Sequence, residues 1–320
     1  MRSTVIIPNY NGIEYLKDCI YSLTEQKKKD FAICVVDNGS EDESVSWIKE
    51  EFPWIQVIEL TENTGFCHAV NVGIKSSNTD YVILLNNDTV VLTDFVENLE
   101  KALEKESGVF SVGAKMLDMK NPKLLDGAGD LYCALGWAYA RGKGREAAKY
   151  YNKYEEVFSA CAGAAIYRKK VFEEIGYFDE NHFAYLEDCD IGYRARIFGY
   201  RNYYEPRAQV YHAGSGASGS RYNEFKVGLA AQNSVYLVYK NMPLLQILIN
   251  LPFFIPGFLI KYLFFVRKGL GKSYREGIKK GIMICKKGKE RKIKFQLSRT
   301  TNYIKIQVLL WKNTLERMTQ

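Results

Sequence analysis

YVILLNNDTVVL, residues 81–92, is the stretch that decides the fold. Its first five residues have strand character and run directly into the polar triplet Asn86-Asn87-Asp88. A continuous apolar run this short is typical of a central strand buried on both faces. The triplet then lies at the carboxyl end of that strand, where open α/β sheets bind ligands. Asp88 is well placed there to hold a divalent cation, although Asn and Asp are also ordinary turn formers.

Three further segments with strand character precede this strand, at residues 4–7, 31–36 and 55–60. Each is followed by a polar turn and then by a segment with helical character. Strand and helix therefore alternate four times, which predicts a parallel, doubly wound α/β sheet with flanking helices. Residues 120–156 lack periodicity and are interpreted as a functional loop that borders the ligand. Farther along we expect strands at residues 109–116, 160–167, 202–204 and 210–212.

The predicted strands end in polar side chains that fall at one edge of the sheet. Asp37, Asn63 and the triplet at 86–88 each follow a strand, and a nucleotide would lie across that edge. The chain has no G-x-G-x-x-G after its first strand and no G-x-x-x-x-G-K-[ST]. Neither a dinucleotide fingerprint nor a phosphate-binding glycine loop is therefore supported. Phosphates would need a metal instead.

Three carboxylates, Glu187, Asp188 and Asp190, stand within four residues at the start of a predicted helix. Like charges this close repel, so we expect at least one raised pKa or a cationic partner. A general base is one use of that arrangement, and capping of the helix is the other. His212 ends a strand before the Gly- and Ser-rich residues 213–220, which could close over a ligand. A single histidine is more often structural than a ligand.

The last part of the chain differs in composition from the rest. From Lys261 onward it holds 17 Lys and Arg against 3 Glu, a net charge of +14, so residues 1–260 carry −7 of the total of +7. Residues 244–266 are apolar but interrupted, and their longest unbroken run is the ten residues 251–260. A bilayer core needs about 20 residues, so we expect docking on an anionic membrane surface. A distorted transmembrane helix or hairpin and a soluble packing or dimerising helix are the alternatives.

The chain divides into two predicted domains, residues 1–225 and 226–320, of which the second is helical and associates with the membrane. Nucleic acid is not an expected partner, because the basic tail carries no recognisable nucleic-acid motif. The seven cysteines are scattered without a C-x-x-C, which favours free thiols in a reducing compartment. The N-terminus lacks the pattern of a secretory signal. We therefore expect a cytoplasmic protein, peripheral on the inner face of the cell membrane.

Six segments, spread in order over about 220 residues, carry a family resemblance: VIIPNYNG (5–12), VVDNGSEDES (35–44), NTGFCHAVNVGI (63–74), YVILLNNDT (81–89), GYFDENHFAYLEDCDIGYRARIFGYR (176–201) and VYHAGSGAS (210–218). In these segments the chain resembles a family 2 glycosyltransferase with the GT-A fold, most closely the rhamnosyltransferase-like branch. The resemblance implies a Rossmann-like, mostly parallel central sheet. It also implies an inverting transfer of a sugar from a nucleotide diphosphate to an acceptor hydroxyl.

The resemblance assigns binding roles to single residues. Asp88 would hold Mg²⁺ or Mn²⁺ on the diphosphate, with His212 as a second protein ligand. The D-x-D of the family stands here as Asn86-Asn87-Asp88, which leaves one carboxylate for the metal. The nucleotide-sugar site would consist of Pro8, Tyr10 and Asn11 around the nucleoside, Asp37 at the edge of the pyrimidine ring, Asn63, Gly65 and Asn71 along the nucleotide, and Asn87 near the ribose.

The resemblance also implies Asp188 as the general base that takes the proton of the acceptor hydroxyl, an assistance typically worth about 10²–10⁴-fold in rate. Asp190 is the less favoured candidate, and Glu187 and Arg194 would support the site. The donor would be dTDP-rhamnose or a UDP-hexose. The acceptor would be a glycan or lipid-linked glycan in cell-surface polysaccharide assembly, and a homodimer is a further option.

Two other functions stay open at this point. A nucleotidyltransferase would be expected to show a Gly-rich, basic signature after the first strand, where this chain has PNYNG (8–12). A sugar-nucleotide or glycan-binding module that has lost activity is favoured only by the missing first carboxylate of the D-x-D.

Overall fold

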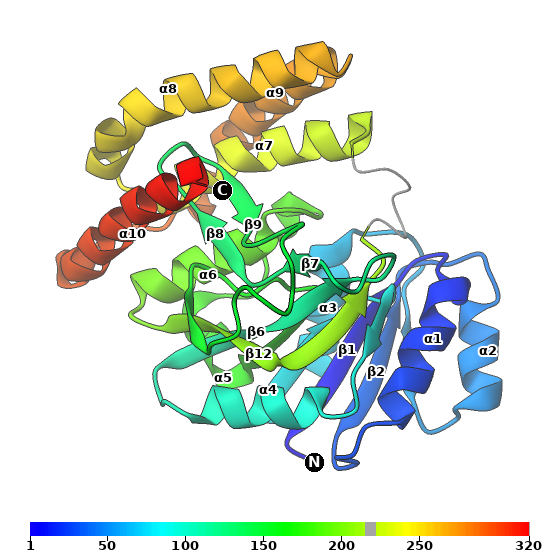
Figure 1. Cartoon of the computed structure of the whole chain (residues 1–320). Helices are drawn as coiled ribbons and strands as arrows, with labels where there is room; N and C mark the ends of the chain where they lie inside the picture. The colour runs from blue at the N-terminus through cyan, green and yellow to red at the C-terminus, as the bar shows by residue number, and fades with distance from the viewer. Residues whose placement is uncertain (215–221, 320) are drawn as a thin grey trace.

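The structure of the protein is a computed structural model that describes residues 1–214 and 222–319 (Figure 1). One mixed sheet runs through it with the strand order β10-β12-β6-β11-β4-β1-β2-β3; β5 pairs with β12 and β7 with β6, while β8 and β9 form a separate hairpin. The strands are β1 (Ser3–Asn9), β2 (Ala32–Asp37), β3 (Gln56–Glu59), β4 (Tyr81–Leu85), β5 (Thr89–Val91), β6 (Val109–Asp118), β7 (Leu125–Gly127), β8 (Asp130–Tyr132), β9 (Ala138–Ala140), β10 (Glu155–Val157), β11 (Ala164–Arg168) and β12 (Arg201–His212). The α-helices are α1 (Ile13–Thr24), α2 (Ser44–Glu51), α3 (Phe66–Ser76), α4 (Phe95–Glu104), α5 (Lys169–Ile175), α6 (Glu187–Ile197), α7 (Glu224–Asn241), α8 (Leu244–Arg267), α9 (Gly271–Lys287) and α10 (Thr300–Thr319).

The first half of the sheet is parallel, as the sequence predicts. β3, β2, β1 and β4 are parallel neighbours, and all five residues of β4 are buried. Apolar side chains of α1, α2 and α4 pack on one face of the sheet, and those of α3, α5 and α6 pack on the other. Burial on both faces explains why β4 is apolar throughout instead of alternating. The carboxyl ends of β1, β2 and β4 meet at one edge.

The second half of the sheet departs from a simple parallel order. β11 lies between β4 and β6, antiparallel to both. β12, predicted as two strands, is one strand whose register with β6 shifts between Glu205 and Gln209. Pro206 lies in that irregularity, where a residue without a backbone donor is tolerated. Residues 120–156, predicted as a loop, contribute the four short strands β7 to β10.

The C-terminal helices lie together on one side of the sheet domain (Figure 1). α7 contacts α6 and α9, and α10 contacts α6 and β8. Polar side chains fix α10: the Asn313 amide donates to the Tyr132 carbonyl (2.8 Å) and the Tyr139 hydroxyl donates to the Asn313 carbonyl (2.7 Å). The second predicted domain is therefore bonded to the first across the expected boundary.

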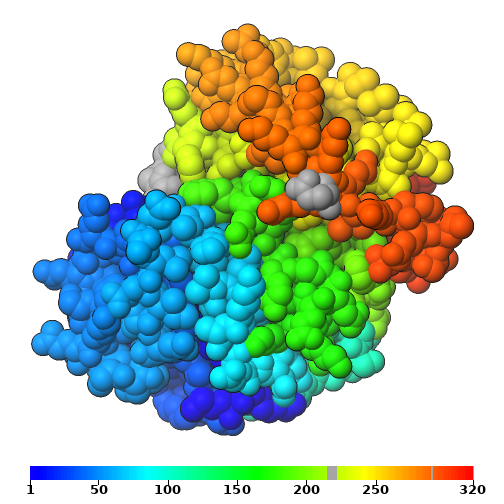
Figure 2. Space-filling view, turned by 180° about the vertical axis from the view of Figure 1, so that it is seen from behind, coloured from blue at the N-terminus to red at the C-terminus, as the bar shows by residue number. Residues whose placement is uncertain are grey.

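α8 is one continuous helix of 24 residues, although Pro252 and Pro256 lie inside it. Both prolines are exposed, and the polar Asn250 points inward, where its amide donates to Gln307 Oε1 (2.7 Å). In length and composition α8 is sufficient to cross a membrane, and only 17% of its apolar window is buried. The interruptions in the apolar segment 244–266 do not break this helix. Figure 2 shows α8 and α9, in yellow and orange, at one end of the molecule.

Candidate functional site

A chain of side-chain hydrogen bonds joins the carboxyl ends of β1, β2 and β4. The Asn87 amide donates to the Asn9 side-chain oxygen (2.8 Å), and the Asn9 amide donates to Asp37 Oδ1 (3.0 Å). All three residues are buried. The Ser40 amide and hydroxyl donate to the two oxygens of Asp37 (2.9 and 2.6 Å). The structure thus brings together the predicted Asp37 and Asn87, with Asn9 as a bridge that the sequence reasoning missed.

Residues 8–11 form the rim of this edge. Tyr10 is 42% exposed, and Pro8 is half-buried. The Asn11 amide donates to Ser40 Oγ (2.9 Å), and its side-chain oxygen accepts from the Glu41 amide (2.8 Å). These bonds tie the turn after β1 to the turn after β2. An exposed aromatic ring therefore stands at the edge where the sequence predicts a nucleoside.

The turn before α3 carries the predicted Asn63 and Gly65. Asn63 is exposed, and its Oδ1 accepts from the Gly65 amide (3.0 Å). Gly65 has a φ of +88°, and a Cβ there would lie 2.5 Å from the Phe183 ring, so only glycine fits. Asn71 is buried in α3 and bonds both the carbonyl and the amide of Phe178 (2.8 and 3.0 Å). Its side-chain hydrogen bonds go to residues 178 and 180, in the segment before α6, and not to the strand ends.

Asp88 and His212 face each other where β5 pairs with the end of β12. His212 is the sheet partner of Thr89, and its Nε2 lies 3.3 Å from Asp88 Oδ1. Its Nδ1 lies 2.7 Å from Asp126 Oδ2, and Lys143 forms an ion pair with the same carboxylate. Burial raises the pKa of Asp126, but His212 and Lys143 outweigh it and lower that pKa to about 2. A carboxylate and an imidazole that a second carboxylate orients fit a divalent cation.

Asp126 is a functional candidate that the sequence reasoning missed. It lies in the segment interpreted as a loop, and the pairing of β7 with β6 brings it to the sheet edge. The available signal for a functional residue here was the pair Asp126 and Asp130 on either side of the small residues 127–129. The glycine- and serine-rich segment predicted after His212 comprises residues 213–220, of which 215–220 lie outside the described residues.

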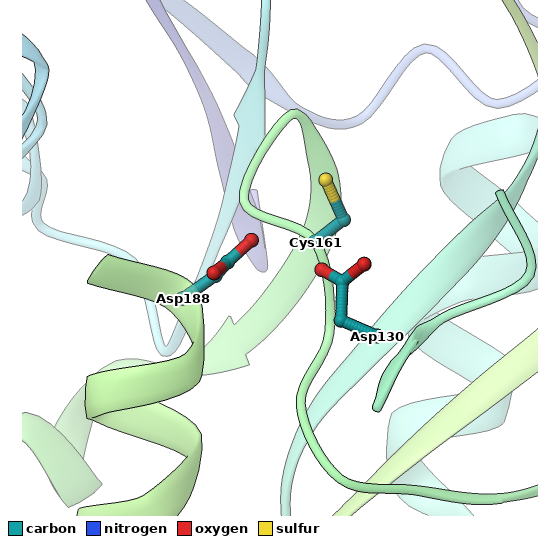
Figure 3. A group of neighbouring side chains, drawn as sticks. All are labelled: Asp130, Cys161 and Asp188. Carbon is teal, nitrogen blue, oxygen red and sulfur yellow. The ribbon is translucent and has the colours of Figure 1, made fainter. Parts of the chain in front are cut away.

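A second acidic cluster lies at the start of α6 (Figure 3). Asp188 of α6, Asp130 of β8 and Cys161 before β11 place one carboxylate or thiol atom each within 4.8 Å of one another. Asp188 is half-buried, whereas Asp130 is buried. Burial raises the pKa of Cys161 well above its usual range, which keeps the thiol protonated and disfavours a metal there. The cluster suits proton transfer better than metal binding.

Burial also shifts the carboxyl groups of this cluster. It raises the pKa of Asp188, while a hydrogen bond with Asp130 and the Cys189 amide oppose the shift. Burial and the charge of Asp188 raise the pKa of Asp130 well above its usual range. The same two causes raise the pKa of Glu187 to about 8. A neutral Asp130 can therefore donate a hydrogen bond to an ionised Asp188, which favours the deprotonated form that a general base needs.

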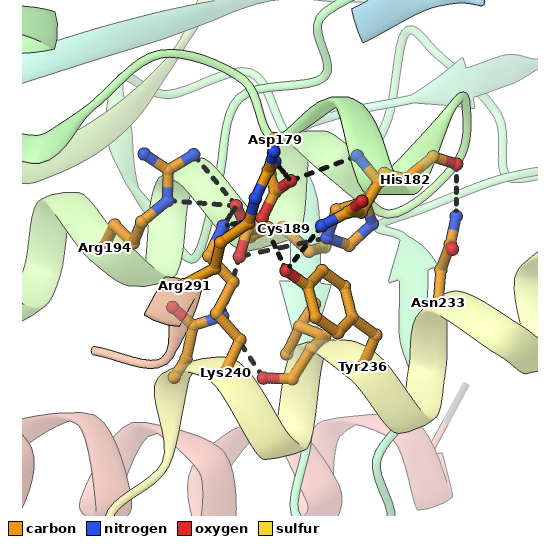
Figure 4. Close-up of polar contacts among 12 residues, drawn as sticks. Asp179, His182, Cys189, Arg194, Asn233, Tyr236, Lys240 and Arg291 are labelled. Carbon is orange, nitrogen blue, oxygen red and sulfur yellow. Dashed lines mark hydrogen bonds and ion pairs between the residues drawn. The ribbon is translucent and has the colours of Figure 1, made fainter. Parts of the chain in front are cut away.

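Asp190 has a different environment from Asp188, because it pairs with Arg194 and Lys240, two residues that Figure 4 labels. Arg194 Nη2 and Lys240 Nζ lie 2.8 and 2.9 Å from Asp190 Oδ2, and the Asn241 amide donates to Oδ1 (2.8 Å). Burial opposes ionisation, but Arg194 and Lys240 outweigh it and hold the pKa of Asp190 far below its usual range. Arg194 also donates to the carbonyls of Ile175 and Gly176 (2.7 and 2.8 Å). Asp190 and Arg194 thus form a buried ion pair. Because a carboxylate with such a low pKa accepts a proton poorly, Asp188 is the better candidate for the base.

The segment that leads to Asp188 has an unusual backbone. Phe183, Tyr185 and Leu186 all have positive φ values, of 59°, 68° and 64°, a conformation that side chains disfavour. The side-chain amide of Asn233, on α7, lies 2.9 Å from the His182 carbonyl and 2.8 Å from the carbonyls of residues 184 and 185. Asn233 is fully buried. It therefore clamps the strained backbone one turn before the acidic cluster.

Replacing Asn233 with Leu is expected to destabilise the protein by about 1–3 kcal/mol, because buried carbonyls lose their donor. Denaturant unfolding of the full chain measures the loss. Asn302→Leu, which removes one half-buried donor to the Ile197 carbonyl, is the matched control and should cost less. Equal losses in the two variants would contradict the clamp.

Comparison with known proteins shows the family and the fold of the chain. Residues 4–176 match the family described as Glycosyl transferase family 2. This match covers more than half of the chain, and the chain belongs to that family. The GT-A fold is shared with solved glycosyltransferases: GalNAc-T7 with UDP, GalNAc and Mn²⁺ superposes with a TM-score of 0.61 at 17% identity, over 75% of this chain and 48% of that one.

Two bacterial relatives show how far the sequence similarity extends. The uncharacterized glycosyltransferase YwdF of Bacillus subtilis is 28% identical over 242 residues, 74% of this chain and 82% of that protein. The teichoic acid poly(glycerol phosphate) polymerase of Staphylococcus epidermidis is 35% identical over 91 residues, 27% of this chain. The chain matches only 13% of the length of that polymerase.

Proposed function

We propose that the protein is an inverting, metal-dependent glycosyltransferase that moves a sugar from a nucleotide diphosphate sugar to an acceptor hydroxyl. The observation that carries the proposal is the turn at residues 161–163. The Asn86 amide donates to the Gly163 carbonyl of this turn (2.9 Å), and Cys161 at its other end belongs to the Asp188 cluster. One short turn thus joins the triplet that ends in Asp88 to the candidate base.

The proposed chemistry follows from these two positions. A divalent cation on Asp88 and His212 would offset the negative charge of the departing diphosphate. Asp188 accepts the proton of the acceptor hydroxyl while that oxygen forms a bond to the sugar C1. The bond from C1 to the diphosphate breaks, and its electron pair leaves with the diphosphate. Because Asp188 takes a proton and does not attack C1, the configuration at C1 inverts.

The finer assignments rest on the sequence resemblance and on the relatives. We propose dTDP-rhamnose or a UDP-hexose as the donor, in line with the rhamnosyltransferase-like motifs and with the placement of Asp37 near an exposed aromatic rim. A lipid-linked or cell-surface glycan is the proposed acceptor, which the teichoic acid relative supports. We further propose a cytoplasmic location at the inner face of the membrane, since α8 exposes an apolar surface beside a basic helix.

Turnover of a panel of nucleotide sugars with Mn²⁺ tests the proposal. A glycosyltransferase releases the nucleoside diphosphate when an acceptor is present. A binding module would bind the donor without release, and a nucleotidyltransferase would release pyrophosphate from a nucleoside triphosphate. Either of these two results, obtained with the full chain and a matching acceptor, would contradict the proposed function.

Binding of the divalent cation is expected to release a proton from His212. Burial lowers the pKa of His212, but hydrogen bonds to Asp126 and Asp88 outweigh it and raise that pKa to about 9. The imidazole is therefore protonated at neutral pH and must lose its proton to act as a ligand. Affinity for Mn²⁺ should fall as the pH is lowered from about 9, by up to about tenfold per pH unit.

Calorimetry in two buffers of different ionisation enthalpy counts this proton. His212→Gln is the control, because its amide does not titrate and its weaker Mn²⁺ binding should lose the buffer dependence. The same apparent binding enthalpy for the wild-type protein in both buffers would show that His212 does not bind the metal in the proposed way.

A further inference from the structure

A groove of about 600 Å³ lies between α7, α8 and α9, apart from the site described above. Eight of the nine residues that line it are aliphatic or aromatic, among them Val238 of α7, Phe258 of α8 and Ile278 of α9. Its volume falls within the range of about 300–1,000 Å³ that small-molecule sites occupy. The groove offers almost no polar partner, so a polar ligand would lose its hydration without compensation.

The groove exists because α9 packs closely on α7 while α8 does not. In α9, a Cβ at Gly277 would lie 2.2 Å from the Gly228 carbonyl, and one at Gly281 would lie 2.6 Å from the Gln232 carbonyl. Only glycine permits this approach of two backbones. α8 meets α9 near the turn between them, where the Phe265 and Tyr274 rings stack at 5.4 Å. The two helices therefore form a wedge whose walls remain apolar.

Two observations identify the chemistry of the occupant. Leu259 and Ile282 line the groove from opposite walls and are still 52% and 46% exposed, so the groove opens onto the uncovered apolar surface of α8. Arg275 is the one charged residue among those that line it, and the exposed Lys279 and Lys280 follow on the same helix. A long hydrocarbon chain fits the walls, and an anionic headgroup fits the basic rim.

We propose that the groove binds one hydrocarbon chain of an anionic membrane phospholipid, with the headgroup phosphate held by Arg275. The lipid anchors the wedge of α8 and α9 to the bilayer surface and covers the inner side of α8. This site does not depend on the proposed sugar transfer, because neither Asp88 nor Asp188 lies in it. The proposal can therefore fail while the transferase assignment stands, and the reverse also holds.

The test is to count the lipid that the full chain retains. Protein is equilibrated with vesicles of phosphatidylcholine, with or without phosphatidylglycerol, extracted in mild detergent and examined by native mass spectrometry. We expect one retained phosphatidylglycerol per chain. Leu259→Trp and Ile282→Trp fill the groove from its two walls and should lower retention by about tenfold or more. Ile304→Trp, at a 59% exposed position on α10, should retain the lipid.

Further variants test the role of the charge of Arg275, and further outcomes distinguish a phospholipid from other occupants of the groove. Arg275→Gln should remove the preference for phosphatidylglycerol over phosphatidylcholine, whereas Lys305→Gln on α10 should keep it. Equal retention by the groove-filled variants and the wild type would overturn the proposal, as would retention of none by the wild type. Retention of a polyprenyl phosphate but of no phospholipid would also overturn it. So would a lipid-free homodimer, seen by sedimentation, that the two groove variants dissociate.

Discussion

Replacing Asp188 with Asn is expected to lower the rate of sugar transfer by about 10²–10⁴-fold while nucleotide-sugar binding stays unchanged. The amide has the shape of the carboxyl group but cannot accept the acceptor proton. Asp130 lies beside it as a buried carboxyl, and burial, the largest cause of its raised pKa, remains when the charge of Asp188 is removed, so Asp130 cannot readily substitute as the base at neutral pH. Single-turnover transfer and calorimetric donor binding, measured on the same preparation, give the two quantities.

Asp190→Asn is the matched control for this variant, since it makes the same change two residues away. Asp190 is fully buried between Arg194 and Lys240, and breaking such a buried pair costs about 3–5 kcal/mol. The Asp190→Asn variant should therefore show first a lower free energy of unfolding. If Asp188→Asn transferred sugar at the wild-type rate, the assignment of the base would be wrong.

Asp88→Ala is expected to abolish the part of nucleoside diphosphate binding that depends on a divalent cation. It removes the only carboxylate of the Asn86-Asn87-Asp88 triplet and leaves His212 without its partner at 3.3 Å. We expect UDP affinity in the presence of Mn²⁺ to fall by about 100-fold or more, since even a residue that only orients a metal ligand contributes about 10–100-fold. Calorimetry with Mn²⁺ and with EDTA measures this difference.

Asp126→Asn tests the carboxylate that holds His212, the proposed second metal ligand, in place. It should weaken Mn²⁺ binding by about 10–100-fold, less than Asp88→Ala, because it only orients the imidazole. Wild-type affinity for UDP that was the same with Mn²⁺ and with EDTA would refute the metal site.

The alternation of strands and helices in the first half of the sheet could be predicted because its signals are local. Each strand there is a short segment with strand character followed by a polar turn and a helix, and in β4 burial on both faces gives a continuous apolar run. Asp37, Asn87 and Asp88 could be placed for the same reason, since each directly follows a strand. The family resemblance then supplied the roles that spacing alone leaves open.

The rest of the site depends on contacts between distant parts of the chain. β7 and β8 have three residues each, too few for a periodic signal, yet they bring Asp126 to His212 and Asp130 to Asp188. Nothing local marks Lys240 as the partner of Asp190, 50 residues away. Asn9 was missed in the sequence because the nucleoside contacts were assigned to the neighbouring residues Pro8, Tyr10 and Asn11.

α7 has a consequence for any attempt to isolate the catalytic part of this protein. A chain cut after residue 225 would keep every motif of the family but lose Asn233, Lys240 and Asn241. Asp190 would keep a buried charge with fewer partners, and the backbone before Asp188 would be free to relax. Such a fragment should expose its hydrophobic interior and bind the dye ANS, so the family motifs alone do not delimit a self-sufficient enzyme.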